Sequence, residues 1–327
     1  MLAATDPVAA FLEAHGTGRS VALRTSGSTG AARSVVRTTD SWVSSFAHIS
    51  SILGMDSCSR VWLPGPVSST MNLFAAVHAR FTGAEIVSSP TDATHAHLTP
   101  AMLGRALDDD LPLAGVHVVV AGDRLPVSVH DRAVAAGIRV SHYYGSAELS
   151  FVAWGSHEGD LRPFPEVEVV LRDGILCVRS SYICQGYDGA GGPFERDEDG
   201  FATVGDRGLL LDGFVRVAGR GTDFVTTNGA TVHVADVEQA LRPLVTGDLV
   251  VVGVPHPELG EVVAAVLTDA SSLPAARAEA RRVLSASHRP RRWFHVADLP
   301  LTPAHKVDRV ALSRLLASPT GDVRRLP

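Results

Sequence analysis

The segment TSGSTGAAR, residues 25–33, decides how the rest of this chain is interpreted. It holds two glycines, four hydroxyl residues and a final arginine, and it follows the short apolar run at residues 21–23. Such a turn can wrap a polyphosphate, because glycine lets backbone N–H groups approach and hydroxyls donate to phosphate oxygens. The kinase-type pattern G-x-x-x-x-G-K-[ST] is excluded, since Gly27 and Gly30 are three residues apart and no lysine follows. Taken alone, the segment is also compatible with a polar surface loop.

The composition is that of a globular protein without a strong electrostatic bias. Of its 327 residues, 45% are hydrophobic and 20% are charged, enough for a sizeable core and two domains. The net charge of −6 argues against nucleic acid or an anionic membrane as the main partner. The basic groups that stand out are Arg289, Arg291 and Arg292, interpreted as a solvated turn, and the tail pair Arg324 and Arg325.

Cysteine usage and apolar runs indicate the compartment. Cys58, Cys177 and Cys184 are an odd number without metal-ligand spacing, so disulfides and zinc are not expected and a reducing compartment is indicated. No positive charge precedes the first apolar residues, and the longest apolar runs, such as residues 249–252, are far too short to cross a bilayer. We therefore expect a cytoplasmic protein.

The residue pattern changes twice along the chain. The first part alternates apolar runs with helical patterns, which predicts a mostly parallel sheet covered by helices. From about residue 151, short alternating segments separated by Arg-Asp-Gly and Leu-Asp-Gly predict antiparallel hairpins. The prediction is an α/β fold with a large N-terminal domain (1–219), whose β-rich subdomain spans about 151–218, and a small mobile α+β C-terminal domain (220–327). The expected strand and helix pairs of the first part are VALRTSG with 41–53, RVWLPG with 72–81 and VHVVVAG with 128–136.

Four more short segments follow the opening loop in a meaningful order. They are YGSAE (144–148), Gly-Asp (205–206), Gly-Arg (219–220) with Gly229, and PLTPAHKVDR (300–309). With TSGSTGAAR they resemble the signatures of the adenylate-forming superfamily: [ST]-S-G-[ST]-T-G-x-P-K, Y-G-x-T-E, T-G-D, G-R-x-x-x-x-I-x-x-x-G and P-x-T-x-x-G-K-x-D-R. Each match is weak by itself, but together they keep the family order from residue 25 to residue 309. The resemblance is closest to short acyl-CoA synthetases of the o-succinylbenzoate-CoA ligase type.

This resemblance implies an enzyme that activates acids. A carboxylate attacks the α-phosphorus of ATP, pyrophosphate leaves, and the acyl-adenylate is passed to a thiol, with CoA the expected acceptor. Both reactants of the first step are anions, so the site must supply positive charge and orientation. The resemblance assigns the loop to the β- and γ-phosphates, and Arg33 takes the place of the usual lysine. The loop residues are Thr25, Ser26, Gly27, Ser28, Thr29 and Gly30.

The other motifs imply the remaining roles. Tyr144 would stack on adenine with Gly145 and Ser146 beside it, and Glu148 would hold Mg²⁺, a hard cation that prefers oxygen ligands. Asp206 would accept both ribose hydroxyls, and Arg220 would approach the same sugar or the α-phosphate. Lys306 would swing in with the small domain to stabilise charge on the α-phosphate. Ordinary structural roles, a strand-end aromatic or a solvated acid or base, stay open for each of these residues.

The acid pocket is less well defined. By resemblance its candidate residues are Val67, His78, His97, Gly122, Arg124 and Tyr143. Several positions depart from the family: Val67 stands where an aromatic-His pair is common, and His78 aligns where o-succinylbenzoate ligases carry an arginine. Ala147 replaces the hydroxyl residue of Y-G-x-T-E. No aspartate occurs at residues 63–74, where relatives that activate amino acids bind the α-amine. We expect an aryl or modest-sized acyl acid.

Acceptor, cofactors and assembly are predicted from the same resemblance. ATP, Mg²⁺ and CoA are expected, with a carboxylic acid as substrate and no nucleic acid or membrane as partner. A carrier protein, an amine or another nucleophile is the alternative acceptor, and a non-catalytic nucleotide-binding relative is the alternative of a different class. The loop lies unusually close to the N-terminus for the family, so one flanking layer would be missing and a homodimer is an open possibility.

Overall fold

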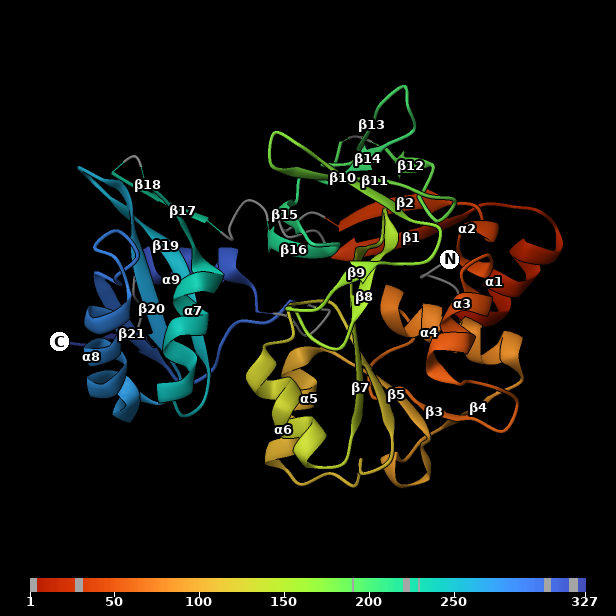
Figure 1. Ribbon diagram of the computed structural model, residues 1–327, viewed down its shortest axis with the longest axis horizontal. Helices are drawn as coiled ribbons and strands as arrows, with labels where there is room; N and C mark the ends of the chain where they lie inside the picture. Colours follow the sequence, from red (N-terminus) through yellow and green to blue (C-terminus); the bar gives the residue numbers. More distant parts are fainter. Residues whose placement is uncertain are drawn as a thin grey trace. The chain divides into compact units, whose positions relative to one another are not determined.

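The computed structural model describes residues 5–26, 32–189, 191–219, 224–228, 230–302, 307–317 and 323–327 (Figure 1). Of Thr25, Ser26, Ala32 and Thr231 only the backbone is described. The chain divides into two compact units, the first reaching Val217 and the second beginning at Ala218.

The first unit is built on a seven-stranded mixed sheet with the order β4-β3-β5-β6-β7-β8-β9. The strands from β4 to β7 are parallel, and β8 and β9 are antiparallel. The mostly parallel sheet predicted for the first part of the chain is therefore confirmed for β3 to β7. Strand bounds are β3 (Arg60–Trp62), β4 (Glu85–Val87), β5 (His95–Leu98), β6 (His117–Val120), β7 (Arg139–Ser146), β8 (Ser150–Gly155) and β9 (Arg162–Pro163).

Both faces of this sheet are covered, which explains why every residue of the central strands β5 and β6 is buried. Side chains of a strand alternate between faces, so Val119 packs into one core while Val118 and Val120 pack into another. The first core is shared with α1 (Pro7–Gly16), α2 (Asp40–Val43), α3 (Phe46–Leu53) and α4 (Thr70–Thr82). The second is shared with α5 (Pro100–Asp108) and α6 (Val127–Ala135), on the opposite side of the sheet in Figure 1.

The helix predicted at 41–53 is interrupted between α2 and α3, whereas those predicted at 72–81 and 128–136 are found as α4 and α6. Helix starts follow local capping rules. Ser69 accepts a hydrogen bond from the backbone N–H of Asn72 at the start of α4, and Thr99 does the same for Met102 at the start of α5. Gly83 ends α4 with φ +77°, a left-handed conformation that suits glycine.

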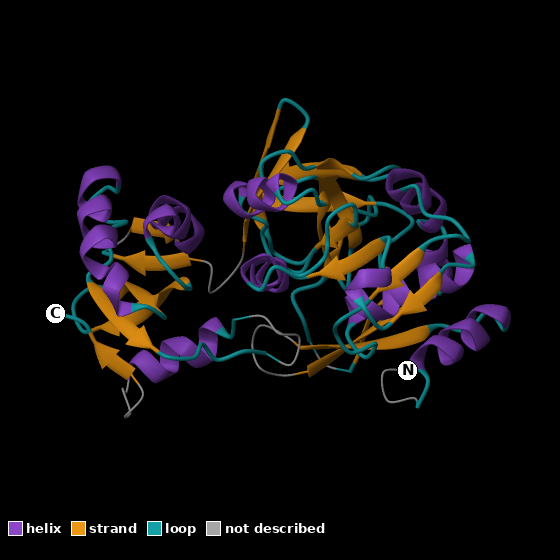
Figure 2. Ribbon diagram, turned by 90° about the horizontal axis from the view of Figure 1, so that it is seen from below, coloured by secondary structure: helices purple, strands orange, loops and turns teal. Residues whose placement is uncertain are grey.

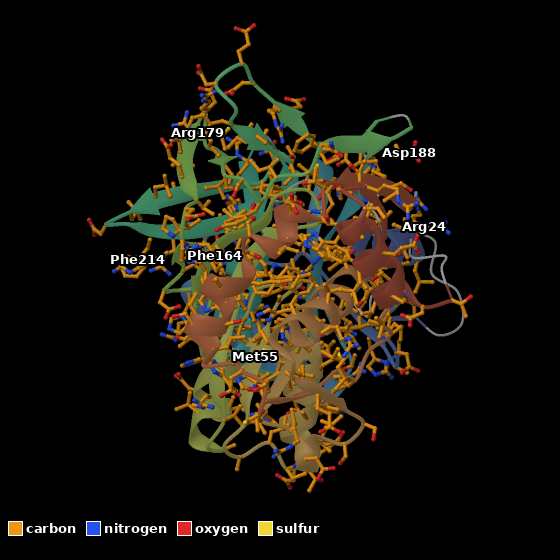
Figure 3. The ribbon with its side chains drawn as sticks, turned by 90° about the vertical axis from the view of Figure 1, so that its right-hand side faces the viewer. Arg24, Met55, Phe164, Arg179, Asp188 and Phe214 are labelled. Atoms are coloured by element: carbon orange, nitrogen blue, oxygen red, sulfur yellow. The ribbon has the colours of Figure 1, made fainter. Side chains whose placement is uncertain are left out.

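The strand that precedes the opening loop is placed differently from the prediction. β1 (Val21–Ser26) is not part of the parallel sheet; it pairs antiparallel with β2 (Ala32–Arg37), which pairs antiparallel with β12 (Gly186–Asp188). The connection between β1 and β2 is too short for a parallel crossover, so the two strands form a hairpin. Arg24, Ser34 and Asp188 stand in one row across this sheet, and Figure 3 shows Arg24 and Asp188 on the same side.

The hairpins predicted from about residue 151 are found as a separate sheet from β10 onward, whereas β8 and β9 belong to the seven-stranded sheet. The order of the separate sheet is β13-β14-β11-β15-β16, with β10 paired to β11. Asp173 and Asp212 adopt positive φ, with Gly174 and Gly213 after them, as the predicted Asp-Gly turns require. Strand bounds are β10 (Glu168–Arg172), β11 (Ile175–Arg179), β13 (Glu195–Arg196), β14 (Ala202–Thr203), β15 (Arg207–Leu211) and β16 (Phe214–Gly219).

The second unit is a sheet with helices on both faces (Figure 2). Its order is β18-β17-β20-β21-β22, with β19 paired to β20. α7 (Val234–Leu241) and α8 (Leu273–Val283) pack on one face, and α9 (Arg309–Ala317) packs on the other. Strand bounds are β17 (Phe224–Thr227), β18 (Ala230–His233), β19 (Leu249–His256), β20 (Gly260–Leu267), β21 (Arg292–Val296) and β22 (Val323–Arg325). Among the described residues, no helix has the length and apolar character needed to span a bilayer.

Candidate active site

Five of the predicted site residues of the first unit lie where parallel strands end. Val67 follows β3, Gly122 and Arg124 follow β6, and Tyr143 and Tyr144 lie near the end of β7. These three strands, with β5 between β3 and β6, are neighbours in the sheet. In open α/β sheets, ligands bind in the crevice outside the carboxyl ends of the strands. The fold thus brings together side chains that are up to 77 residues apart in the sequence.

Tyr144 and Asp206 meet directly. The phenol of Tyr144 donates a hydrogen bond of 2.6 Å to Oδ2 of Asp206, and Asp206 is buried. Asp206 lies between β14 and β15, which belong to another sheet than β7. Two motifs that lie 62 residues apart in the sequence are therefore in direct contact, as a site that binds a single nucleoside would require.

Gly145 is required by a close backbone approach. A Cβ atom added there would lie 1.9 Å from the carbonyl oxygen of Ser150, at the irregularity in the pairing of β7 with β8. Ser150 itself has a positive φ of 58°. This tight reversal turns the chain after Tyr144 and buries Glu148 immediately beyond it.

Glu148 is fixed from β12. Its Oε1 accepts a hydrogen bond of 2.8 Å from the phenol of Tyr187, and its carbonyl oxygen accepts one of 2.8 Å from the backbone N–H of Cys184. Burial and the hydrogen bond to Glu148 raise the pKa of Tyr187, and the positive charge of Arg33 acts in the opposite direction. Tyr187 stays a phenol at neutral pH and keeps its proton to donate.

The strand after the loop, β2, carries two arginines on the face where Tyr187 lies. Side chains alternate along β2, so Arg33, Val35 and Arg37 share one face, and Val35 is paired with Tyr187. Arg33 is half-buried and Arg37 has no exposed surface. The negative charge of Glu148 acts to raise the pKa of Arg37, and the positive charge of Arg33 acts to lower that of Tyr187, so both arginines interact electrostatically with the Glu148–Tyr187 pair.

Arg37 ties three segments together. Its Nε donates to Oγ of Ser41 at 2.9 Å, Nη1 donates to the carbonyl of Ala147 at 2.9 Å, and Nη2 donates to the carbonyl of Tyr182. Burial lowers the pKa of Arg37 to about 10, opposed by the charges of Cys184 and Glu148. The side chain therefore remains cationic near neutral pH and fixes the backbone just before Glu148.

The two predicted histidines lie in the core. His78 on α4 has no exposed surface and its Nε2 lies 2.8 Å from Oγ of Ser50. His97, within β5, is 4% exposed. Burial lowers the pKa of His78 to about 4 and that of His97 to about 3, so both are neutral. Their substrate contacts stay predictions, and such burial is typical of core residues.

The other pocket candidates are better placed. Arg124 is half-buried and donates to the carbonyl of Val217. Gly122 is exposed and has φ +94°. Tyr143 stacks on Trp154 with ring centroids 5.5 Å apart, and burial raises its pKa. Val67 is partly buried against the first core.

Part of the predicted site lies outside the described residues. These positions are Gly27, Ser28, Thr29, Gly30, Arg220 and Lys306. Thr25 and Ser26 are described as the end of β1 by their backbone alone, and Ser146 accepts a hydrogen bond of 3.1 Å from the backbone N–H of Leu149.

The carboxylates described near the site suit a magnesium ion that binds together with a nucleotide, rather than a metal ion held by protein side chains alone. Among the described residues, no three His, Cys, Asp or Glu side chains are arranged to hold a metal ion. Mg²⁺ is usually bound through one or two carboxylates together with phosphate oxygens and water. Glu148, buried and held through one of its two carboxylate oxygens, fits that role.

Comparisons with known proteins identify the family. The model of the family described as AMP-binding enzyme matches residues 21–188. This chain belongs to that family. The resemblance to adenylate-forming enzymes is thus confirmed, and the chain is an AMP-forming acyl-CoA ligase family enzyme. The probable 2-succinylbenzoate–CoA ligase of Mycobacterium tuberculosis is 30% identical over 281 residues, which cover 81% of this chain and 72% of that protein.

Solved structures agree with the fold. ATP-bound MatB from Rhodopseudomonas palustris matches with a TM-score of 0.79 at 22% identity, over 91% of this chain and 68% of MatB. The amide bond synthetase McbA from Marinactinospora thermotolerans matches with a TM-score of 0.74 at 26% identity, over 90% of this chain and 69% of McbA. In both solved structures, the remaining residues have no match in the present chain.

Sequence reasoning did not identify Arg37 and Tyr187. A charged residue at the end of the apolar strand SVVR is unusual, and alternation from Arg33 would have placed Arg37 on the same face. Tyr187, in contrast, lies 39 residues from Glu148, and only the pairing of β12 with β2 brings the two together.

Proposed function

We propose that this enzyme uses ATP to convert an aryl or modest-sized carboxylic acid to an acyl-adenylate, with release of pyrophosphate, and then forms a thioester with CoA. The observation that carries the proposal is the hydrogen bond between Tyr144 and Asp206. It joins a strand-end aromatic ring to a buried carboxylate, which are the two groups needed to hold an adenine and its ribose.

The described residues would divide the work as follows. Tyr144 and Asp206 would bind the nucleoside, and Arg33 would attract the phosphates that the loop between β1 and β2 cradles. Glu148 would hold Mg²⁺, which neutralises phosphate charge when it is bound. Arg124, Gly122, Val67 and Tyr143 would line the acid pocket at the carboxyl edge of the sheet.

Lys306 would supply the positive charge that the adenylation step needs. It is the only lysine of the chain, although lysine and arginine together number 29. Its place within PLTPAHKVDR matches the family motif, and a compact ammonium suits a developing phosphate charge. We infer that residues 220–327 form a mobile lid that brings Lys306 to the site for the first step and withdraws it for the second. Arg220 would act near the sugar.

The single lysine makes a direct test possible. Lys306→Ala should reduce acid-dependent pyrophosphate release by at least about a hundredfold, while ATP binding changes little. Lysine-directed acylation of the native enzyme should have the same effect, and ATP plus acid should protect against it. Pyrophosphate release at the native rate from the Ala variant would refute the assignment, and background release with a broad acid panel would favour a non-catalytic relative.

A second acceptor deserves its own assay. McbA, an amide bond synthetase, shares 26% identity with this chain. The same adenylate could therefore pass to an amine instead of CoA, with a carrier-protein thiol as a further alternative. Product mass with each acceptor in turn separates these outcomes, since pyrophosphate exchange reports only the shared first step.

A further inference from the structure

A basic cluster lies in the unit that begins at Ala218, and none of its residues is among those proposed for adenylation. A hollow of about 360 Å³ is lined by Arg277, Arg291, Arg292, Trp293, Arg325, Leu326 and Pro327. Four of these seven residues are arginines, and none is acidic. The arginines come from α8, from the start of β21 and from β22.

The sheet register brings these separated arginines together. β22 pairs antiparallel with β21, with Phe294 opposite Arg325. The backbone N–H of Leu326 donates to the carbonyl of Trp293 at 2.8 Å, and both side chains are buried. The end of the chain lies beside α8 in Figure 1. Two basic stretches more than 30 residues apart thereby form one surface, which the interpretation of residues 289–292 as a solvated turn did not anticipate.

The guanidinium groups have no acidic partner in the part of the chain that the structure describes. Within the described residues, none of the four pocket arginines takes part in an ion pair. Glu279, on the same helix as Arg277, is already paired with Arg282 at 2.5 Å. Arg292 donates to the carbonyl of Pro255 at 3.4 Å, and the guanidinium of Arg277 lies 5.9 Å from the centroid of the Trp293 ring. The cluster therefore creates a positive potential that a multivalent anion would relieve.

We propose that this hollow is a binding site for a small molecule with a phosphate or diphosphate group. Planar guanidinium forks match phosphate oxygens in pairs, which a point charge cannot do. The volume lies within the range of small-molecule sites. A nucleic acid is a poorer fit, because the whole chain carries a net charge of −6. The proposal is independent of the adenylation chemistry.

The experiment compares two double variants with equal loss of charge. Arg291→Ala with Arg325→Ala removes two exposed pocket arginines. Arg281→Ala with Arg324→Ala removes two exposed arginines that adjoin the hollow in sequence but do not line it. Isothermal titration of the full chain uses two probes: inorganic pyrophosphate and adenosine 3′,5′-bisphosphate.

The pocket variant should bind the better probe about a hundredfold more weakly than the native chain, or about tenfold for each arginine removed. The matched variant should retain the native affinity. The predicted phosphate loop would also bind pyrophosphate. Binding at the pocket is therefore the part of the titration that is lost in the pocket variant and retained in the matched variant. Tighter binding of pyrophosphate assigns the site to bare polyphosphates, and tighter binding of the bisphosphate assigns it to a phosphorylated nucleoside.

Two results would overturn the proposal. One is equal affinity of the pocket variant, the matched variant and the native chain for both probes. The other is an equal loss in both variants, which would show only the effect of net charge. Thermal unfolding of each variant checks the fold, and failure of adenylation activity in the native chain has no bearing on either outcome.

Discussion

The phenolic oxygen of Tyr187 lies 2.8 Å from Oε1 of Glu148. Tyr187 is held in turn by its surroundings: Gly192 lies so close to its ring that a Cβ there would be 2.1 Å from Cε2. The ring of Phe194 meets that of Tyr187 edge to face, with centroids 6.3 Å apart. A fixed phenol thus orients one carboxylate oxygen of Glu148, which leaves the other as the candidate magnesium ligand.

Tyr187→Phe tests this orientation. Removing the phenol oxygen should raise the Mg²⁺ concentration for half-maximal pyrophosphate release by about tenfold, because a hydrogen bond to a charged group is lost. The maximal rate at saturating Mg²⁺ should change less. Tyr182→Phe is the control, since Tyr182 donates to Pro165 and Glu166 instead; an equal Mg²⁺ shift in both variants would contradict the assignment.

Tyr144→Phe tests nucleoside binding. The variant should raise the KM for ATP by about fivefold, equivalent to about 1 kcal/mol, because Asp206 loses a donor that fixes it. In an Asp206→Ala background the same change should have little further effect, since the two residues act as a pair. Additive losses in steady-state kinetics would show that the hydrogen bond between them plays no part in ATP binding.

Arg37→Met should destabilise the fold. It leaves the carbonyls of Ala147 and Tyr182 without their donors, and such losses cost about 3 kcal/mol in total. Urea unfolding measures the change in the free energy of unfolding. Arg179→Met, which removes an exposed pair with Glu168, should change that free energy by less than about 1 kcal/mol. Equal effects would mean that the buried hydrogen bonds contribute nothing.

Gly145→Ala should prevent normal folding, because its Cβ would overlap the carbonyl oxygen of Ser150. Expression yield and circular dichroism are the measurements. The control is Gly104→Ala within α5, where a Cβ meets nothing within 4 Å. That variant should be more stable by about 0.5–1 kcal/mol, since alanine favours helix. A well-folded Gly145→Ala protein would show that the turn before Glu148 can relax.

Stability should fall in mild acid because of buried histidines. Burial lowers the pKa of His78, His117 and His142 to about 4 and that of His97 to about 3. The histidines of the unfolded chain bind protons near pH 6.5, whereas these buried histidines do so only at lower pH. The free energy of unfolding therefore has its full value above about pH 6.5 and decreases as the pH falls toward 4.

The slope can be assigned to individual residues. Each such histidine contributes up to about 1.4 kcal/mol per pH unit across this window. His117→Gln should reduce the slope of unfolding free energy against pH by about that amount between pH 6 and 5. Asp160 does not confuse the result, because its lowered pKa places its effect below pH 3.8. A slope unchanged by His117→Gln would mean that His117 titrates normally in the fold.

Local pattern was a good guide to most elements but not to their pairing. Period-3.6 and period-2 patterns predicted α4, α6 and the later hairpins, because each element buries one face against a core. The strand before the loop was wrongly assigned to the parallel sheet, since an apolar run of three residues says nothing about its partner. The break between α2 and α3 also escaped prediction, because both halves continue the same apolar face.

The sequence by itself predicted the family correctly and put forward the nucleotide loop, Glu148, Asp206 and the sole lysine as site residues, because the family's motifs keep their residue types and their order along the chain. Only the tertiary structure decided that Tyr144 meets Asp206, that Tyr187 and Arg37 hold the segment around Glu148, and that four arginines share one hollow. The reason is physical: each of these contacts depends on strand register and on which face a side chain takes, and both are set by partners far away in the chain.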